Sequence, residues 1–147
     1  MNFKDQILEL SRKYSDQTVE NLSQMIKIPS YSGHEREICT KIIELCKAND
    51  FDEVWVDGFG SVVGRIGKGK KKLAFDAHID TVEIGDETQW KVQPFSGERR
   101  NGLVYGLGAS DQLGGASSMI TAGRILKDLE YGGDYSCYFT FTVMEED

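Results

Sequence analysis

The sequence predicts an α/β fold in which helices pack on a largely buried β-sheet. Helical and strand-like patterns alternate along the chain, and the runs at residues 73–78 and 135–143 are nearly all apolar apart from their C-terminal ends. Such runs are typical of strands that are covered on both faces. The 147 residues suffice for one core, so we expect one domain or part of one.

Helices are expected in the first third of the chain. Apolar residues recur at helical spacing over residues 3–28, with a break near Ser15–Asp16, and Pro29 ends this segment. A second helix is predicted to follow Ser32 as its N-cap, with Glu35 completing a capping box, and to end near residue 48.

Three short strands are predicted next. Residues 54–56, 61–66 and 73–78 are rich in β-branched and aromatic side chains, and glycine-containing turns separate them. The basic cluster Lys68–Lys72 lies at the second of these turns. We interpret it as a solvated hairpin tip.

The remaining elements are an irregular segment, a helix and a strand. Residues 83–101 are polar, with Trp90 and Phe95 as expected anchors. A helix is predicted over residues 114–129, and its small first residues allow close approach of the backbone. The aromatic and threonine-rich run at residues 135–143 predicts a final strand.

Composition argues against two classes of function. The net charge of −7 disfavours sequence-independent binding of nucleic acid, and no apolar run reaches the roughly 18 residues of a membrane span.

The three cysteines lack metal-site spacing, and Cys39 and Cys46 should share one buried helix face. Since no signal segment is visible, we expect a reduced, cytoplasmic protein.

Histidine and acidic residues stand where the apolar runs end. His78 and Asp80 close one run, Glu145 and Glu146 follow the other, and Asp111 precedes the predicted helix at 114–129. Ligands of open α/β sheets gather at the carboxyl ends of strands. We therefore expect these side chains to meet.

Their chemistry indicates a metal site. Imidazole and carboxylates suit zinc and similar ions, and the two oxygens of a carboxylate can bridge two of them. Asp111 is thus a candidate bridge between a metal on His78 and a metal on Glu146. Asp80 is placed to brace His78. The adjacent Glu145 and Glu146 should differ in role, since one can bind metal while the other remains free to take a proton from water.

Each motif also has a non-functional interpretation. A lone His-x-Asp is often a core pair and an acidic end is often solvated, but the motifs together favour a metal site. His34 is expected to be solvated. Residues 64–71 nearly match a P-loop, yet Lys71 replaces the Ser or Thr that binds magnesium, so a nucleotide-binding module is a weaker alternative.

Three segments resemble metallopeptidase family twenty, the group of acetylornithine deacetylase, succinyl-diaminopimelate desuccinylase and the aminoacylases. They are FDAHIDTV (75–82), YGLGASDQLGG (105–115) and VMEED (143–147), in the order of the family. The opening helix up to residues 28–30 is also similar, so the resemblance covers essentially the whole chain. Residues 110–112 and 144–147 resemble the branch of selenium-metabolism hydrolases.

The resemblance implies a zinc-peptidase-like, three-layer sandwich with a mixed sheet and two zinc ions, for which cobalt or manganese could substitute. It implies that His78 and Glu146 each bind one ion, that Asp111 bridges them, that Asp80 braces His78, and that Glu145 is the general base. The implied reaction is hydrolysis of amide bonds in dipeptides or N-acyl amino acids. Full-length members would form homodimers.

The resemblance also sets limits. Family members continue beyond the Glu-Glu pair with further ligands and a lid or dimerisation domain. We therefore expect residues 1–147 to be the N-terminal part of a catalytic domain, incomplete at its C-terminus. An inactive truncated fragment or pseudoenzyme is the alternative, and we expect this chain alone to bind metal weakly, expose apolar surface and show no hydrolysis. Leu113 stands where the family usually has Lys, and we expect this change to affect local packing or charge and not the chemistry.

Overall fold

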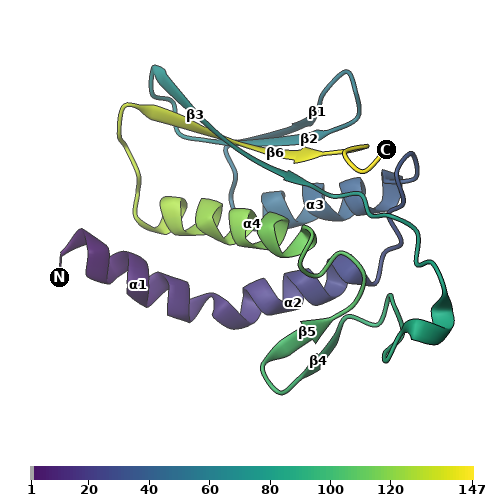
Figure 1. Cartoon of the computed structure of the whole chain (residues 1–147). Helices are drawn as coiled ribbons and strands as arrows, with labels where there is room; N and C mark the ends of the chain where they lie inside the picture. Colours follow the sequence, from purple (N-terminus) through teal and green to yellow (C-terminus); the bar gives the residue numbers. More distant parts are fainter. Residues whose placement is uncertain (1) are drawn as a thin grey trace.

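A mixed four-stranded sheet organises the structure, a computed structural model in which residues 2–147 are described (Figure 1). The strands are β1 (Glu53–Val56), β2 (Val62–Ile66), β3 (Lys71–His78) and β6 (Tyr135–Thr142). Their spatial order is β1-β2-β6-β3, and β3 runs parallel to β6 while the other neighbours are antiparallel. The predicted α/β class with a mixed sheet is confirmed.

Helices lie on one face of this sheet in Figure 1. They are α1 (Phe3–Lys13), α2 (Ser15–Ile26), α3 (Arg36–Ala48) and α4 (Leu113–Asp128). α3 and α4 contact the strands, and α1 and α2 pack against α4 on the side away from the sheet. The predicted break near Ser15 is confirmed, because α1 ends at Lys13 and α2 begins at Ser15.

The segment between β3 and α4 is more ordered than the sequence predicted. It contains the 3-10 turn η1 (Glu87–Gln89) and a hairpin of β4 (Glu98–Arg100) and β5 (Leu103–Tyr105). The expected anchors are present: the Trp90 Nε1–H donates to the carbonyl oxygen of Ile84 at 2.9 Å, and the Phe95 ring meets the Tyr31 ring edge to face.

The basic cluster Lys68–Lys72 does not lie at a hairpin tip, so that prediction was wrong. β6 lies between β2 and β3, and the connection between these two strands therefore passes over the end of β6. Residues 68 and 70–72 are nevertheless exposed. Local alternation of turn and strand signals cannot reveal a strand inserted from later in the chain.

The beginning of α3 also differs from the prediction. Glu35 occupies the N-cap position, and no side chain makes a capping hydrogen bond there. Ser32 and Glu35 therefore form no capping box. Their side chains instead form hydrogen bonds with residues that follow the carboxyl ends of β3 and β6, namely Asp80 and Met144.

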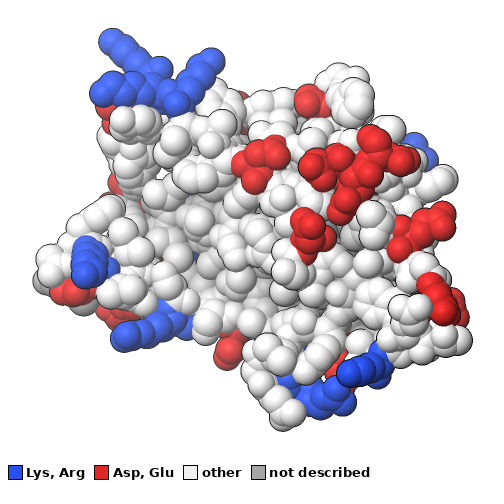
Figure 2. All heavy atoms as spheres, viewed as in Figure 1, with Lys and Arg blue, Asp and Glu red and all other residues white. Residues whose placement is uncertain are grey.

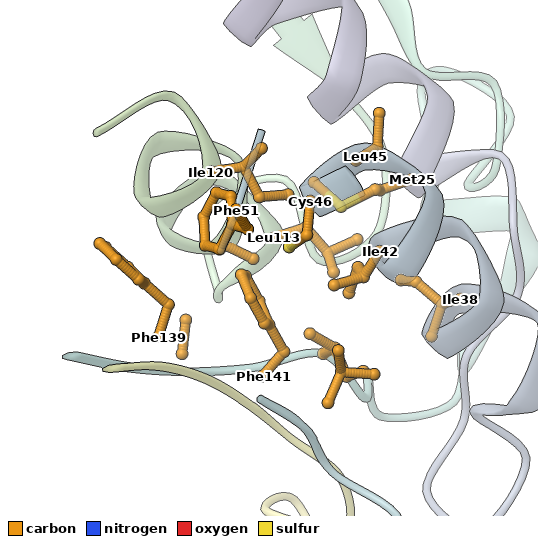
Figure 3. Packing of buried hydrophobic residues seen from close by; sticks show 14 of the residues in the cluster. Met25, Ile38, Ile42, Leu45, Cys46, Phe51, Leu113, Ile120, Phe139 and Phe141 are labelled. Atoms are coloured by element: carbon orange, nitrogen blue, oxygen red, sulfur yellow. The ribbon is translucent and has the colours of Figure 1, made fainter. Parts of the chain in front are cut away.

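The core lies between the sheet and helices α2, α3 and α4. β6 contributes Phe139 and Phe141 because alternate residues of a strand point to the same face. Facing them across the interface are the helical residues Met25, Ile38, Ile42, Leu45, Cys46, Leu113 and Ile120 (Figure 3). Leu113 is thus a core residue, in keeping with the expected packing effect.

Apolar surface is exposed near the sheet edge formed by β3. Phe3 and Ile7 of α1, Phe75 of β3 and several residues of α4 line a shallow groove. Phe75 is 42% exposed and stacks on the buried Phe139. The predicted exposure of apolar surface is confirmed.

Among the residues that the structure describes, no helix has the length and apolarity needed to cross a membrane.

Phe51 joins the sheet to α4 because two glycines make room for its ring. A Cβ on Gly64 of β2 would lie 2.5 Å from the ring, and one on Gly123 of α4 would lie 2.3 Å from it. The ring also meets Phe139 edge to face. With backbone on both sides, the ring cannot move away from one glycine without approaching the other.

We expect Gly123→Ala to destabilise the fold by about 1–3 kcal/mol, as overpacked core substitutions do. This loss outweighs the gain of about 1 kcal/mol that alanine brings to a helix. The measurement is urea unfolding followed by circular dichroism. Gly58→Ala is the control, since no atom lies within 4 Å of its added Cβ; equal stability of the two variants would contradict the packing argument.

The cysteines should react slowly in the folded chain. Burial raises the pKa of Cys46 to about 12, and burial together with the nearby Glu35 raises that of Cys39 to about 11. Because the thiolate is the reactive form, iodoacetamide at pH 8 should modify the folded protein slowly and all cysteines rapidly in guanidinium. Mass spectrometry gives both rates. Fast modification of Cys46 without denaturant would be the contrary result.

Candidate metal centre

Three elements deliver the candidate residues to one edge of the sheet. His78 is the last residue of β3 and pairs in register with Thr142 of β6, so Glu145 and Glu146 leave the sheet beside it. α4 is the crossover between these parallel strands. Asp111 lies just before its first turn and returns to the same edge.

Glycines allow the loop before α4 to approach β3. Gly108 has φ +75°, and a Cβ there would lie 2.8 Å from the Thr81 side chain. The peptide bond between Asp111 and Gln112 is cis. The glycine-rich segment thus serves the close packing of the loop that carries Asp111.

His78 is the centre of the cluster. Its Nε2 lies 2.9 Å from Asp111 Oδ1, 3.7 Å from Glu145 Oε2 and 3.9 Å from Glu146 Oε1. The imidazole is 3% exposed, whereas the Asp111 side chain is 79% exposed. The predicted meeting of these side chains is present in the structure.

Asp80 lies on the other side of the imidazole. His78 Nδ1 is 3.0 Å from the main-chain oxygen of Asp80 and 3.6 Å from its carboxylate. With a proton on Nδ1 donated to that main-chain oxygen, the lone pair of Nε2 faces the acids. The carboxylate of Asp80 is fully buried and accepts hydrogen bonds from Ser32 Oγ and from the Glu146 main-chain N–H.

The donor set fits a transition-metal ion such as zinc. Ligand atoms of His78, Asp111 and Glu146 all lie within 4.8 Å of one another. Metal bonds of about 2.1 Å place ligand atoms about 3–4 Å apart, so small side-chain movements suffice. Acidic side chains also gather near the end of β6 in Figure 2, where a cation would offset their repulsion.

The pKa directions reflect this charge balance. Burial acts to lower the pKa of His78, but the hydrogen bond to Asp111 and the charges of Asp80 and Glu145 outweigh it, so the pKa is raised. Burial acts to raise the pKa of Asp80, but the donors from Glu146 and Ser32 outweigh it, so the pKa is lowered. In the metal-free fold, the acidic groups around His78 therefore favour the protonated form of its imidazole.

The alternatives drawn from sequence do not find support in the geometry. His34 is exposed, as expected. Gly64 lies inside β2, and the segment that resembles a P-loop leads into β3 with no helix after it. Such a strand-to-strand connection lacks the helix N-terminus that holds phosphate in a P-loop, so the nucleotide-binding alternative is wrong.

Comparison with known proteins places this geometry in a family. The model of "Peptidase family M20/M25/M40" matches residues 74–147, which hold all five candidate residues. The chain therefore belongs to this peptidase family. It is 42% identical over 141 residues to YgeY of Escherichia coli (strain K12), covering 96% of this chain and 35% of that protein.

Other relatives differ in the activities that their names state. A succinyl-diaminopimelate desuccinylase of Bradyrhizobium is 38% identical over 98 residues, covering 66% of this chain and 26% of that protein. Human carnosine dipeptidase 1 has a TM-score of 0.80 at 18% identity, with 97% of this chain and 35% of that chain covered. The chain thus spans about a third or less of the length of these three proteins.

One structural relative is described as a dinuclear metal-binding peptidase. Bacillus subtilis YxeP has a TM-score of 0.67 at 19% identity, with 92% of this chain and 37% of that chain covered. At such identity the likeness shows the shared fold. The family thus includes metal-binding members, and the ligand cluster at His78 is the candidate site in this chain.

The charge of Asp80 should make metal-free stability depend on pH. Because its folded-state pKa lies below the ordinary value of about 3.9, its contribution is present above that value and lost as pH falls through the folded-state pKa. Asp80→Asn should flatten this part of the curve of unfolding free energy against pH. Urea unfolding of metal-stripped protein between pH 2 and 6, roughly the carboxyl range, measures it; parallel curves would contradict this assignment.

Proposed function

We propose that residues 1–147 are the N-terminal part of the catalytic domain of a two-metal amide-bond hydrolase. The observation that carries the proposal is the convergence of His78, Asp111 and Glu146 within 4.8 Å, at the end of two parallel strands. The family match supports it. In this proposal the lid or dimerisation domain lies outside residues 1–147.

His78 would hold one zinc ion, Glu146 the other, and Asp111 both. Asp111 suits the bridging role because its exposed carboxylate already contacts His78 Nε2 and leaves a second oxygen free for another ion. When bound, the two ions polarise the scissile carbonyl and favour deprotonation of water. Cobalt or manganese, which accept the same nitrogen and oxygen ligands, could substitute.

Glu145 is the proposed general base. Its side chain is 56% exposed and its Oε2 lies 3.7 Å from His78 Nε2, so it borders the ligand cluster while remaining open to water. From this position the carboxylate can take a proton from the attacking water and return it to the leaving amine. Asp80 keeps His78 in the orientation that this arrangement requires.

The proposed substrates are small N-acyl amino acids or dipeptides. Relatives named for desuccinylation and for carnosine dipeptide cleavage support an amide substrate of this size. The net charge of −7 gives no support for nucleic acid as a partner. We further propose a cytoplasmic enzyme that is a homodimer at full length.

A chain without turnover is the second candidate for the 147 residues alone. Its supporting observation is that the chain spans 35% of YgeY, so residues elsewhere in such relatives are available to complete the metal shell. We propose that the isolated chain binds zinc weakly and does not hydrolyse amides. The whole protein would do both.

Zinc binding and turnover should separate between variants. In the whole protein, Glu145→Ala should keep zinc but lose about 100- to 10,000-fold in kcat, the range of general-base catalysis. His78→Ala and Asp111→Ala should lose zinc as well. Isothermal titration of metal-stripped protein measures zinc, and release of amine from N-acetyl amino acids and dipeptides measures turnover.

Glu9→Ala is the matched control, since Glu9 is an exposed acid on α1. It should leave both zinc binding and turnover unchanged. Unchanged turnover in Glu145→Ala would rule out the base assignment, and undiminished zinc binding in His78→Ala would rule out the site. Zinc binding without hydrolysis of any amide by the whole protein would favour the pseudoenzyme.

A further inference from the structure

The loop between α2 and α3 is hydrogen-bonded to the segment that follows β3. The Thr81 main-chain N–H donates to the carbonyl oxygen of Ser30 at 2.9 Å, and Tyr31 forms an isolated parallel bridge with Thr81. Residues 32–35 follow this attachment directly. The loop therefore has a fixed position beside the candidate metal centre.

Ser32 contacts the metal centre through Asp80. Its hydroxyl donates to Asp80 Oδ2 at 2.7 Å, and the same oxygen accepts the Glu146 main-chain N–H at 3.0 Å. Asp80 is fully buried, so water does not replace either donor. The hydroxyl thus helps to hold the carboxylate that fixes the backbone of Glu146.

Glu35 contacts the same turn two residues before Glu146, at Met144. Its Oε1 accepts the Met144 main-chain N–H at 3.0 Å, although the residue is only 6% exposed. Buried acids are rare unless a partner compensates them. Met144 has φ +56°, a left-handed conformation that costs free energy for a side chain other than glycine. The hydrogen bond from Met144 to Glu35 stabilises this conformation.

We propose that Ser32 and Glu35 are positioning residues that clamp the turn at residues 144–146 and thereby aim Glu145 and Glu146 at the metals. Buried carboxylates hold the main-chain N–H groups on either side of Glu145, one from Glu35 and one from Asp80, which Ser32 supports. This inference rests on the proposed metal site. It adds two residues that act through Asp80 and through the main chain of this turn.

The test uses two pairs of variants of the whole protein. Ser32→Ala and Glu35→Ala remove the contacts, whereas Ser32→Thr keeps the hydroxyl and Glu35→Gln keeps the acceptor oxygen. Glu35 makes no side-chain cap on α3, so its replacement does not remove a helix cap. Thermal unfolding of each variant shows that it remains folded.

Two readouts are expected to change together. Titration with zinc alone should show about 10- to 100-fold weaker binding in the alanine variants, as for other residues that support metal ligands, and near wild-type binding in Ser32→Thr and Glu35→Gln. Hydrogen exchange of the main-chain N–H groups in metal-free protein, followed by nuclear magnetic resonance, should be faster at Met144 in Glu35→Ala and at Glu146 in Ser32→Ala.

The possible outcomes distinguish a failure of the proposed clamp from a failure of the proposed metal site. Wild-type zinc affinity and unchanged exchange in folded alanine variants would overturn the clamp while leaving the metal site intact. Faster exchange without weaker zinc binding would also overturn it, since the turn would then be held for structure alone. Zinc binding that does not require His78 would overturn both the proposed function and the positioning role.

Discussion

The parallel pairing of β3 with β6 is the constraint on which the site depends. Parallel neighbours require a long crossover, and here α4 supplies it and returns Asp111 to the edge where His78 stands. The register sets Thr142 opposite His78, so the next residues of the chain leave the sheet beside the imidazole. A shift of one residue would turn His78 to the other face.

The sequence was sufficient for the helices and for the four strands of the main sheet, though not for the β4–β5 hairpin, and for the meeting of the acids with His78. Apolar runs with polar ends are local patterns, and the rule that strand ends gather ligands supplied the rest. The order of strands was not accessible in the same way. Whether β6 pairs beside β2 depends on contacts between distant segments, and the hairpin interpretation of Lys68–Lys72 failed for this reason.

Ser32 and Glu35 illustrate a different limit. A serine followed three residues later by glutamate satisfies a local rule for helix capping, and no local observation argued against it. Their partners lie 48 and 109 residues away, at Asp80 and Met144. Once the sheet forms, these buried partners lie within hydrogen-bond distance, and no side chain caps α3. Tertiary contacts therefore overrode the local preference.

The position of β3 at the edge of the sheet has a consequence for handling this chain. An edge strand presents a row of free peptide groups that can template another strand, and apolar side chains strengthen such an association. Lys71 and Lys72 disfavour it at the start of β3, but Leu73 and Phe75 are 43% and 42% exposed. This stretch is where strand addition between separate molecules would begin.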